Sequence, residues 1–374
     1  MSQHILVFIS SLNAGGAERV TSNLVNWWAG AGKQVTLVTL SAITDDFYKF
    51  SPEVERISLG MVRARTNPLS GVMNNILRVL ALRRILRKKT PDIALAMIAK
   101  SNILLSVASY GLSNIIVIGA ERTYPPRAGL GAFGSCMRRY WYGRLAAVVA
   151  QTKEAKDWLL RHTQAKKVFV IPNAIHLPLP TQAPILEPEK VVALGRKVLL
   201  AVGRLSDEKG FDLLIDAFSK IATKHADWDL VVVGEGPLRS FLETRVILAG
   251  LEGRILFVGL VGNMGAWYEF ANLFVMSSRY EGFPNTLIEA LAYGLPAISF
   301  DCDAGPRDII RDRIDGVLVP VNNTNSLAEA ADLLMVDDAL REQFSIRAKD
   351  ARDRFSVERV AYAWDALFDE LCDI

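Results

Sequence analysis

Short apolar runs alternate with helix-length segments along the first half of the chain. Runs rich in Val, Ile, Leu and Ala predict strands at 5–9, 35–40, 93–97, 115–119, 146–150 and 168–171. Segments between them, such as 17–29 and 155–163, have the length and composition of helices. Uniformly apolar strands separated by helices are typical of a parallel sheet that is covered on both faces.

A proline-rich stretch interrupts this alternation. Residues 172–190 hold five prolines, which cannot continue a helix or a central strand. The alternation then restarts, with strands predicted at 198–202, 230–233, 255–258, 273–276, 297–300 and 317–319. We therefore predict an α/β protein of two doubly wound, Rossmann-like domains that face a central cleft, with ligand bound beside the carboxyl ends of the strands.

The length of 374 residues agrees with two domains, because single cores rarely grow to that size. The predicted parts are an N-terminal domain over 1–172, a linker over 173–195, a C-terminal domain over 196–355 and a C-terminal helix over 356–374. We expect that last helix to pack back on the N-terminal domain.

The composition is typical of a globular cytoplasmic protein, with 51% hydrophobic and 22% charged residues. Three cysteines lie far apart, which argues against a disulfide framework and favours a reducing compartment. The apolar run within residues 1–10 lacks the basic start and cleavage site of a signal peptide. No uninterrupted apolar run reaches the roughly 18 residues of a transmembrane helix.

Charge is divided unequally between the halves. Residues 1–177 hold 23 Lys/Arg and 9 Asp/Glu, a net charge of +14, whereas residues 178–374 carry a net charge of −11. This asymmetry predicts that only the first half faces a polyanion or an anionic membrane.

Two adjacent glycines follow the first predicted strand. Gly15 and Gly16 open the helix at 17–29, where they allow a ligand to approach the backbone and where the helix N-terminus favours an anion. The alternative is an ordinary strand-to-helix turn that contacts no ligand. The dinucleotide-binding pattern G-x-G-x-x-G is absent.

Two cations follow the first strand of the second domain. The segment GRLSDEKG at 203–210 holds Gly203, Arg204 and Lys209 at the carboxyl end of that strand. A departing diphosphate needs cationic donors at such a position, since negative charge grows as the bond to it breaks. The alternative is a pair of solvated loop cations.

Two glutamates bracket the start of a later helix. In EGFPNTLIE at 281–289, Pro284 favours a helix start, which puts Glu281 in the preceding loop and Glu289 on the first turns. Both carboxylates can then face one ligand. The backbone N–H groups expected to point toward its phosphate are those of Asn285, Thr286 and Leu287.

Taken together, Arg204, Lys209 and the Glu-x7-Glu segment resemble the family-4 retaining glycosyltransferases of the GT-B fold. The supporting segments are Gly15-Gly16, Ile171-Pro-Asn173, Gly234-Glu-Gly-Pro237 and 304–310. The similarity extends over nearly the whole chain. It is strongest to bacterial enzymes that extend lipid-linked oligosaccharides and surface polysaccharides such as lipopolysaccharide.

The resemblance implies hexosyl or N-acetylhexosaminyl transfer from a nucleotide-diphosphate sugar, for which UDP-sugars are the commonest choice in the family. Arg204 and Lys209 would bind the diphosphate, Glu281 the sugar hydroxyls and Glu289 the ribose. Gly16 would approach the phosphates, and the turn from Gly234 would lie near the nucleobase. The remaining donor-site residues are Gly15, Gly203, Gly236, Gly282, Phe283, Asn285, Thr286 and Leu287.

One position departs from the family pattern. Many members carry a His beside the reacting sugar, in the region that here reads GAERTYPP at 119–126. Glu121 or Arg122 is expected to stand in for it. The group that acts as the acceptor-side base stays open.

Two acid-free basic segments predict the acceptor side. Residues 56–91 hold nine Lys/Arg, and residues 122–153 mix arginines with aromatic residues. The residues that we expect to face an anionic membrane and a polyprenyl-diphosphate-linked glycan are Arg78, Arg83, Arg84, Arg87, Lys88, Lys89 and Arg122. This predicts an enzyme peripheral on the inner face of the cell membrane. A sheet-covering helix with a solvated basic edge is the alternative.

Metals and nucleic acid are not expected. The four histidines show no ligand spacing, and Asp301-Cys-Asp303 offers too few oxygens for a hard metal. No nucleic-acid motif is present. The rival functions are a nucleotide-sugar epimerase or phosphorylase of the same architecture, a nicotinamide oxidoreductase, and a non-catalytic sugar- or lipid-binding module.

Overall fold

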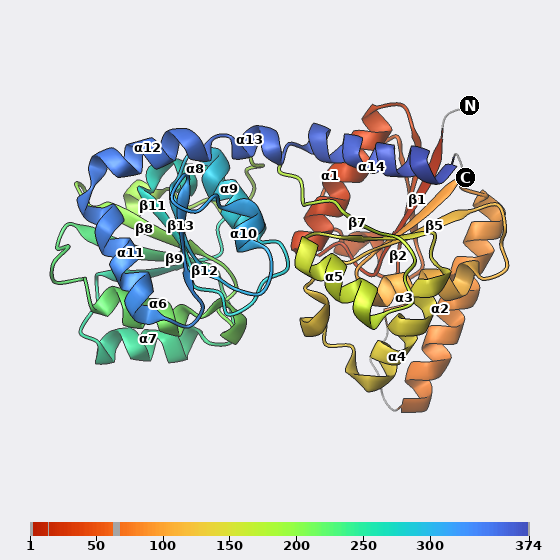
Figure 1. The fold of residues 1–374 in the computed structure, drawn as a ribbon, viewed down its shortest axis with the longest axis horizontal. Helices are drawn as coiled ribbons and strands as arrows, with labels where there is room; N and C mark the ends of the chain where they lie inside the picture. Colours follow the sequence, from red (N-terminus) through yellow and green to blue (C-terminus); the bar gives the residue numbers. More distant parts are fainter. Residues whose placement is uncertain (1–2, 14, 63–67, 373–374) are drawn as a thin grey trace. The chain divides into compact units, whose positions relative to one another are not determined.

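The computed structural model describes residues 3–13, 15–62 and 68–372. The chain forms two compact units (Figure 1). Unit 1 comprises Met1–Ala174 and Val357–Ile374, and unit 2 comprises Ile175–Ser356. Position 14 of the first glycine motif, residues 63–67 of the first basic segment and the end of the predicted last helix at 373–374 lie outside the described residues.

Unit 1 contains a seven-stranded parallel sheet in the order β3-β2-β1-β4-β5-β6-β7. Its strands are β1 (His4–Ile9), β2 (Gln34–Thr39), β3 (Val54–Ser58), β4 (Ile93–Met97), β5 (Ile116–Ala120), β6 (Ala147–Ala150) and β7 (Val168–Val170). Its helices are α1 (Gly16–Gly30), α2 (Pro68–Lys89), α3 (Ala99–Ser109), α4 (Gly131–Trp141), α5 (Lys153–His162) and α14 (Val357–Cys372), with 3-10 turns η1 (Ile43–Asp45), η2 (Pro125–Arg127) and η3 (Tyr142–Arg144).

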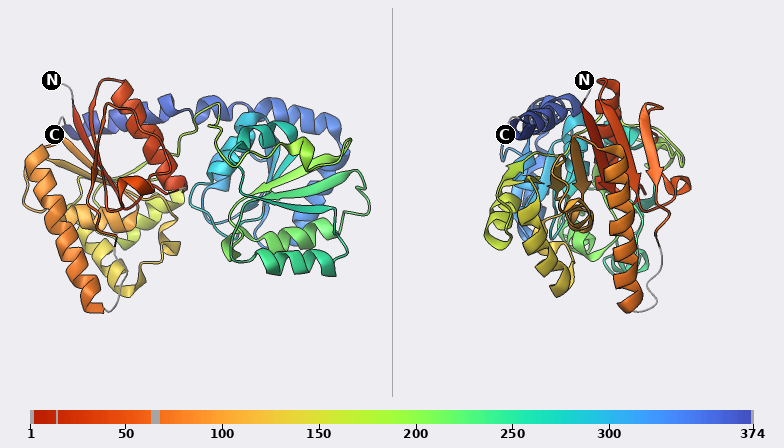
Figure 2. Two further views of the ribbon diagram at one scale, coloured as in Figure 1. Left: turned by 180° about the vertical axis from the view of Figure 1, so that it is seen from behind. Right: turned by 90° about the vertical axis from the view of Figure 1, so that its right-hand side faces the viewer.

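Helices cover both faces of this sheet (Figures 1 and 2). One face packs on α1 and α14, where Trp28 meets Trp364 edge-on at 6.3 Å between ring centroids. The other face packs on α2, α3 and α5. Seven buried side chains of α14 belong to the first of these cores, so a helix that follows unit 2 in the chain completes unit 1.

Unit 2 contains a six-stranded parallel sheet in the order β10-β9-β8-β11-β12-β13. Its strands are β8 (Lys197–Val202), β9 (Trp228–Val233), β10 (Ile255–Gly259), β11 (Leu273–Met276), β12 (Ala297–Asp301) and β13 (Gly316–Pro320). Its helices are α6 (Phe211–Ser219), α7 (Arg239–Leu248), α8 (Met264–Phe270), α9 (Asn285–Tyr293), α10 (Pro306–Ile309), α11 (Thr324–Val336), α12 (Asp338–Ala348) and α13 (Ala351–Arg354), with 3-10 turns η4 (Pro188–Lys190) and η5 (Asp207–Lys209).

Both sheets confirm the predicted doubly wound, Rossmann-like fold class. In each, the strand order reverses once, between β1 and β4 in unit 1 and between β8 and β11 in unit 2. Loops leaving the two strands at such a switch point diverge to opposite faces of the sheet, and the space between them is where α/β proteins bind ligands.

One strand was missed in the sequence. β3 at Val54–Ser58 is the edge strand next to β2, and after Val54 its residues are exposed or only partly buried. Its sequence VERIS therefore lacks the uniform apolar character by which the buried strands were found.

Candidate functional site

The switch point of unit 2 brings together two of the predicted site residues. Lys209 leaves β8 through η5, and Glu281 follows β11. The ammonium of Lys209 lies 2.6 Å from Oε1 of Glu281, and the same oxygen accepts a hydrogen bond from Ser278 Oγ at 2.6 Å. Although burial disfavours the charged ammonium, the carboxylate of Glu281 and its hydrogen bond raise the pKa of Lys209. The ammonium of Lys209 therefore stays protonated at neutral pH, partly buried beside Glu281.

Hydrogen bonds between the two loops hold this pair in place. Ser277 Oγ donates to the carbonyl of Lys209 at 2.9 Å, and the N–H of Arg279 donates to the carbonyl of Glu208 at 2.8 Å. Gly210, at φ 62°, permits the approach, because a Cβ there would lie 2.1 Å from the carbonyl oxygen of Ser277. Gly210 is therefore required for the close contact between the two loops, which the motif alone did not show.

Arg204 stands at the same edge of the sheet with its side chain exposed. Its guanidinium has no hydrogen bond or ion pair with any residue that the structure describes. A guanidinium offers five donors in a planar fork that matches phosphate oxygens. Beside the Lys209–Glu281 pair, Arg204 is a cation that remains available to an anionic ligand.

The Gly234–Pro237 turn supports the loop that carries Arg204. The N–H of Leu205 donates to the carbonyl of Glu235 at 3.0 Å. A Cβ on Gly234 would lie 1.9 Å from the carbonyl oxygen of Gly203, and one on Gly236 would lie 2.4 Å from that of Leu205. Both glycines are thus required for close backbone packing, whatever they contact in a ligand.

The segment from Gly282 leads into α9, which begins directly after Pro284 as predicted. Asn285 and Thr286 form the start of its first turn. The N–H of Leu287 donates to the carbonyl of Pro284 at 3.2 Å. This first turn therefore offers fewer donors to a phosphate than the sequence alone suggested.

Glu289 and Phe283 are more buried than expected of ligand-binding residues. Glu289 is 3% exposed and accepts a hydrogen bond from Tyr268 Oη at 3.0 Å. Phe283 packs edge-on against Phe355 with 5.8 Å between ring centroids. In this conformation Phe283 serves the core of unit 2, and Glu289 is held beneath the surface.

Cys302 is a neighbour of the site that motif analysis did not assign. Burial, followed by the charge of Glu281, raises the pKa of its thiol to about 12. Its position directly after β12 was the available signal, because that strand ends at the same sheet edge. Asp301, one residue earlier, pairs with Arg307 at 2.8 Å. Within the described ranges, no cluster of three or more His, Cys, Asp or Glu could hold a metal ion.

In unit 1, Gly15 and Gly16 stand at the start of α1, beside the end of β1. Gly15 caps the helix, and its carbonyl accepts a hydrogen bond from Tyr48 Oη at 3.0 Å. A Cβ on Gly15 would meet the carboxylate of Glu18 at 2.2 Å. Burial raises the pKa of Glu18. An acidic side chain therefore lies at the helix start that was expected to face phosphate.

Glu121 lies at the carboxyl end of β5 inside a buried polar network. It is 2% exposed and accepts a hydrogen bond from Tyr142 Oη at 2.6 Å, with Arg138 3.7 Å away. Burial raises its pKa, although Tyr142 and Arg138 counteract this. Its Oε2 atom has no hydrogen-bond partner within the described structure. In this conformation, Glu121 holds Tyr142 instead of facing a ligand.

Arg122 is also buried. Its guanidinium donates to Oδ1 of Asn173 at 3.1 Å and lies 5.6 Å from the ring of Trp364 on α14. Burial lowers its pKa to about 9. Arg122 of the Glu-Arg pair at 121–122 therefore contacts Asn173 of the Ile171-Pro-Asn173 segment. The two motifs lie far apart in the sequence, which did not predict this contact.

The cations of α2 divide into tethered and exposed side chains. Arg78 donates to the carbonyl of Met61, Arg83 to those of Ala108 and Tyr110, and Lys89 pairs with Glu55. The exposed cations are Arg84, Arg87 and Lys88. Among the residues of α2 whose side chains are described, five exposed apolar ones follow helical spacing, namely Val72, Met73, Ile76, Leu77 and Leu80. No helix in the described ranges is long and apolar enough to cross a membrane.

Comparison with known proteins relates both halves of the chain to one class of enzymes. Residues 14–178 match the family described as "Glycosyltransferase Family 4", and residues 184–351 match "Glycosyl transferases group 1". Together the two matches cover residues 14–351 apart from 179–183.

Two relatives show how far the sequence similarity extends. The chain is 28% identical to N-acetylgalactosamine-N,N'-diacetylbacillosaminyl-diphospho-undecaprenol 4-alpha-N-acetylgalactosaminyltransferase of Campylobacter jejuni, over 98% of each chain. It is 34% identical over 228 residues to exopolysaccharide phosphotransferase SCO2592 of Streptomyces coelicolor. That match covers 60% of this chain and only 23% of the relative.

Among solved structures, the fold is shared with Anabaena Alr3699/HepE in complex with UDP and glucose. The TM-score is 0.79 at 17% identity, over 98% of this chain and 99% of that one.

Proposed function

This chain belongs to the family-4 glycosyltransferases of the GT-B fold, and on that premise we propose that it transfers a sugar from a UDP-sugar to a lipid-linked glycan. The acceptor is a glycan carried on polyprenyl diphosphate, and the product serves bacterial surface polysaccharide or glycan assembly. The observation that carries this proposal is the Lys209–Glu281 pair at the switch point of unit 2, with the exposed Arg204 beside it.

Two observations support the donor part of the proposal, namely the cations at the switch point of unit 2 and the UDP in a structure of the same fold. Arg204 and Lys209 bind the diphosphate, since both follow β8 at the switch point, where doubly wound α/β proteins bind ligands. Glu281 accepts hydrogen bonds from the sugar hydroxyls, which would compete with Ser278 and Lys209 for its oxygens. UDP is the ligand in the Anabaena structure that shares this fold. The cations of this site make a divalent metal unnecessary for neutralising the diphosphate.

The reaction we propose retains the anomeric configuration. The acceptor hydroxyl oxygen bonds to the anomeric carbon on the face from which the diphosphate oxygen departs, and its proton passes to that departing oxygen. Arg204 and Lys209 stabilise the growing negative charge on the diphosphate. Glu121 acts as a positioning residue in this proposal, because its carboxylate engages Tyr142 below the surface.

The acceptor half rests on α2. Its exposed apolar residues and its exposed cations, Arg84, Arg87 and Lys88, give it the composition of a helix that lies in a membrane interface. Anionic lipids attract such cations. We therefore place the enzyme peripherally on the cytoplasmic face of the cell membrane, where a polyprenyl-diphosphate glycan is presented. The lipid-linked substrate in the name of the Campylobacter relative supports this.

The test is a transfer assay with the full chain, UDP-sugars and a polyprenyl-diphosphate sugar. We expect UDP release and a longer glycan only when both substrates are present. Conversion of the donor alone would instead indicate an epimerase. Lys209→Ala and Glu281→Ala should each reduce turnover at least about 100-fold.

Lys224→Ala is the matched control, since Lys224 forms an exposed ion pair with Asp332 elsewhere in unit 2. It should keep wild-type turnover. Normal turnover with Lys209→Ala would refute the assignment of the site.

A further inference from the structure

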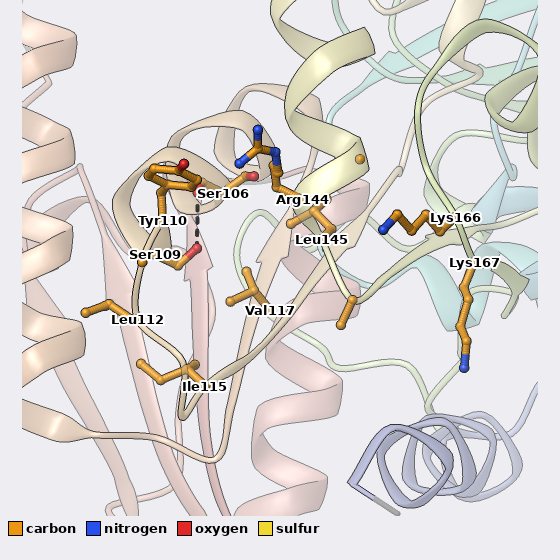
Figure 3. A pocket seen from close by; sticks show the side chains of 13 residues that line it. Ser106, Ser109, Tyr110, Leu112, Ile115, Val117, Arg144, Leu145, Lys166 and Lys167 are labelled. Carbon is orange, nitrogen blue, oxygen red and sulfur yellow. Dashed lines mark hydrogen bonds between the residues drawn. The ribbon is translucent and has the colours of Figure 1, made fainter. Parts of the chain in front are cut away.

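Unit 1 holds a pocket away from the strand ends that carry Gly15 and Glu121. It is lined by the end of α3 and by the residues that lead into β5, β6 and β7 (Figure 3). The pocket thus lies at the amino ends of these parallel strands, opposite to the carboxyl ends where α/β proteins usually bind ligands. The pocket has a volume of about 420 Å³, which lies in the range of small-molecule sites.

The lining of this pocket combines an apolar floor with a cationic rim. The apolar side chains are Leu112, Ile115, Val117 and Leu145, and the cations are Arg144, Lys166 and Lys167. No carboxylate is among the described residues that line it. Such a lining favours an anion that carries an apolar group.

Arg144 is held in place without being neutralised. Its guanidinium lies 5.0 Å from the ring centre of Tyr110 and 5.1 Å from that of Tyr140, and it donates to Tyr140 Oη at 2.6 Å. Neutral aromatic partners orient an arginine and leave its charge available to a ligand.

Lys166 and Lys167 differ in direction. Figure 3 shows the Lys166 side chain extending toward Leu145 and Arg144, whereas Lys167 turns away. Lys167 pairs with Glu370 of α14 at 3.4 Å. The exposed ammonium of Lys166 has no hydrogen bond or ion pair with the residues described. Two cations, Arg144 and Lys166, therefore remain uncompensated at the rim.

We propose that this pocket binds a phosphate-bearing amphiphile, with its phosphate or diphosphate between Arg144 and Lys166 and its apolar part on Leu112, Ile115 and Leu145. Neither the donor site nor the proposed membrane contact of α2 uses these residues. Arg83 of α2 donates to the carbonyl of Tyr110 at 2.7 Å, so the rim is tied to the basic helix. An anionic phospholipid headgroup and a free diphosphate share the chemistry that this rim would bind.

Calorimetry with the full chain tests the pocket, using inorganic diphosphate and dihexanoyl phosphatidic acid as probes and zwitterionic dihexanoyl phosphatidylcholine as the neutral reference. The measurements use an Arg204→Ala, Lys209→Ala background, because both residues are proposed to bind diphosphate in unit 2. Adding Arg144→Gln and Lys166→Gln should weaken binding of the anionic probes at least about tenfold.

The matched control adds Lys153→Gln and Arg161→Gln, which remove the same charge from exposed positions of α5. It should change the affinity less than about twofold. Tighter binding of phosphatidic acid than of diphosphate supports an amphiphile with a lipid headgroup, whereas the reverse order would show that the apolar floor takes no part and would overturn the proposal. Equal losses in both pairs of variants, or no saturable binding of either anionic probe, would overturn the proposal. Loss of turnover in Lys209→Ala tests the donor site separately.

Discussion

The two switch points of this protein share one topology and differ in chemistry. In unit 2, β8 and β11 lead to a charged pair, Lys209 and Glu281, with an exposed arginine beside it. In unit 1, β1 and β4 lead to neutral hydroxyls, Ser10 and Ser101, whose oxygens are 3.1 Å apart. The cations that we propose for diphosphate binding thus lie in the acidic half of the chain, so the proposal does not follow the total charge of each half.

The difference extends to how each site is supported. Unit 2 uses backbone contacts between glycine-containing loops, and unit 1 uses a buried network of Glu121, Tyr142 and Arg138. The first arrangement fixes a loop that faces solvent, whereas the second fixes an interior. We therefore expect substitutions in the two units to differ in their effects on stability and on binding.

The largest structural effect should come from Gly234→Ala. The new Cβ would lie 1.9 Å from the carbonyl oxygen of Gly203 at φ 142°, so the β8 loop must move. We expect a loss of about 3 kcal/mol in the free energy of unfolding, together with loss of UDP binding.

Gly195→Ala is the control for Gly234→Ala. Gly195 also has positive φ, but apart from the adjoining residues no heavy atom of the described chain lies within 4 Å of the point that a Cβ would occupy. This variant should cost about 1 kcal/mol and leave UDP binding intact. Denaturant unfolding and calorimetry measure both effects. Equal losses in the two variants would show that backbone strain alone acts at Gly234.

The next effect concerns the basic surface of unit 1. Replacing Arg84, Arg87 and Lys88 by Gln should weaken binding to anionic liposomes, since each cation near such a surface contributes about 1 kcal/mol. Flotation with anionic and zwitterionic vesicles measures it. The matched control replaces three exposed cations of unit 2, namely Lys220, Lys224 and Arg347. Similar loss in both variants would place the membrane contact elsewhere.

A smaller effect should appear in the pH dependence of stability. Because the pKa of Glu121 is raised in the folded state, the native protein holds this proton more tightly than the unfolded chain does. Its contribution to stability is present below the ordinary glutamate pKa and is lost as pH rises through the raised value.

Glu121→Gln should therefore remove this pH-dependent loss of stability, measured by unfolding at several pH values above the ordinary glutamate pKa of 4.5. Glu53→Gln, at an exposed position, should keep the wild-type profile. Identical profiles for wild type and Glu121→Gln would contradict the assignment.

The smallest effect is chemical. Cys302 is buried with its pKa raised to about 12, whereas Cys136 and Cys372 are exposed. Iodoacetamide at a pH of about 8 should label the exposed pair and leave Cys302 unmodified, as mass spectrometry would show. Bound UDP should not alter this result. Rapid labelling of Cys302 would mean that the site opens more than the structure indicates.

The sequence predicted the architecture well, because buried parallel strands such as those at 5–9 and 93–97 are continuous apolar runs. Strand β3 escaped because an edge position does not require that pattern. The sequence predicted that Lys209 and Glu281 serve one ligand, but it did not predict the ion pair between them. The burial of Glu289 and Glu121 could not be predicted either, because a glutamate looks the same in the sequence whether its carboxylate faces a ligand or a tyrosine. Here the tyrosines are Tyr268 and Tyr142.

The place of α14 has a consequence for biosynthesis. Unit 2 is one continuous stretch of chain, so it can fold as soon as the ribosome releases it. Unit 1 starts first but waits for Trp364, Phe368 and their neighbours to cover Trp28. During that interval the apolar face beside α1 is uncovered, and a released chain that ended between 356 and 372 would have one finished unit and one unfinished unit.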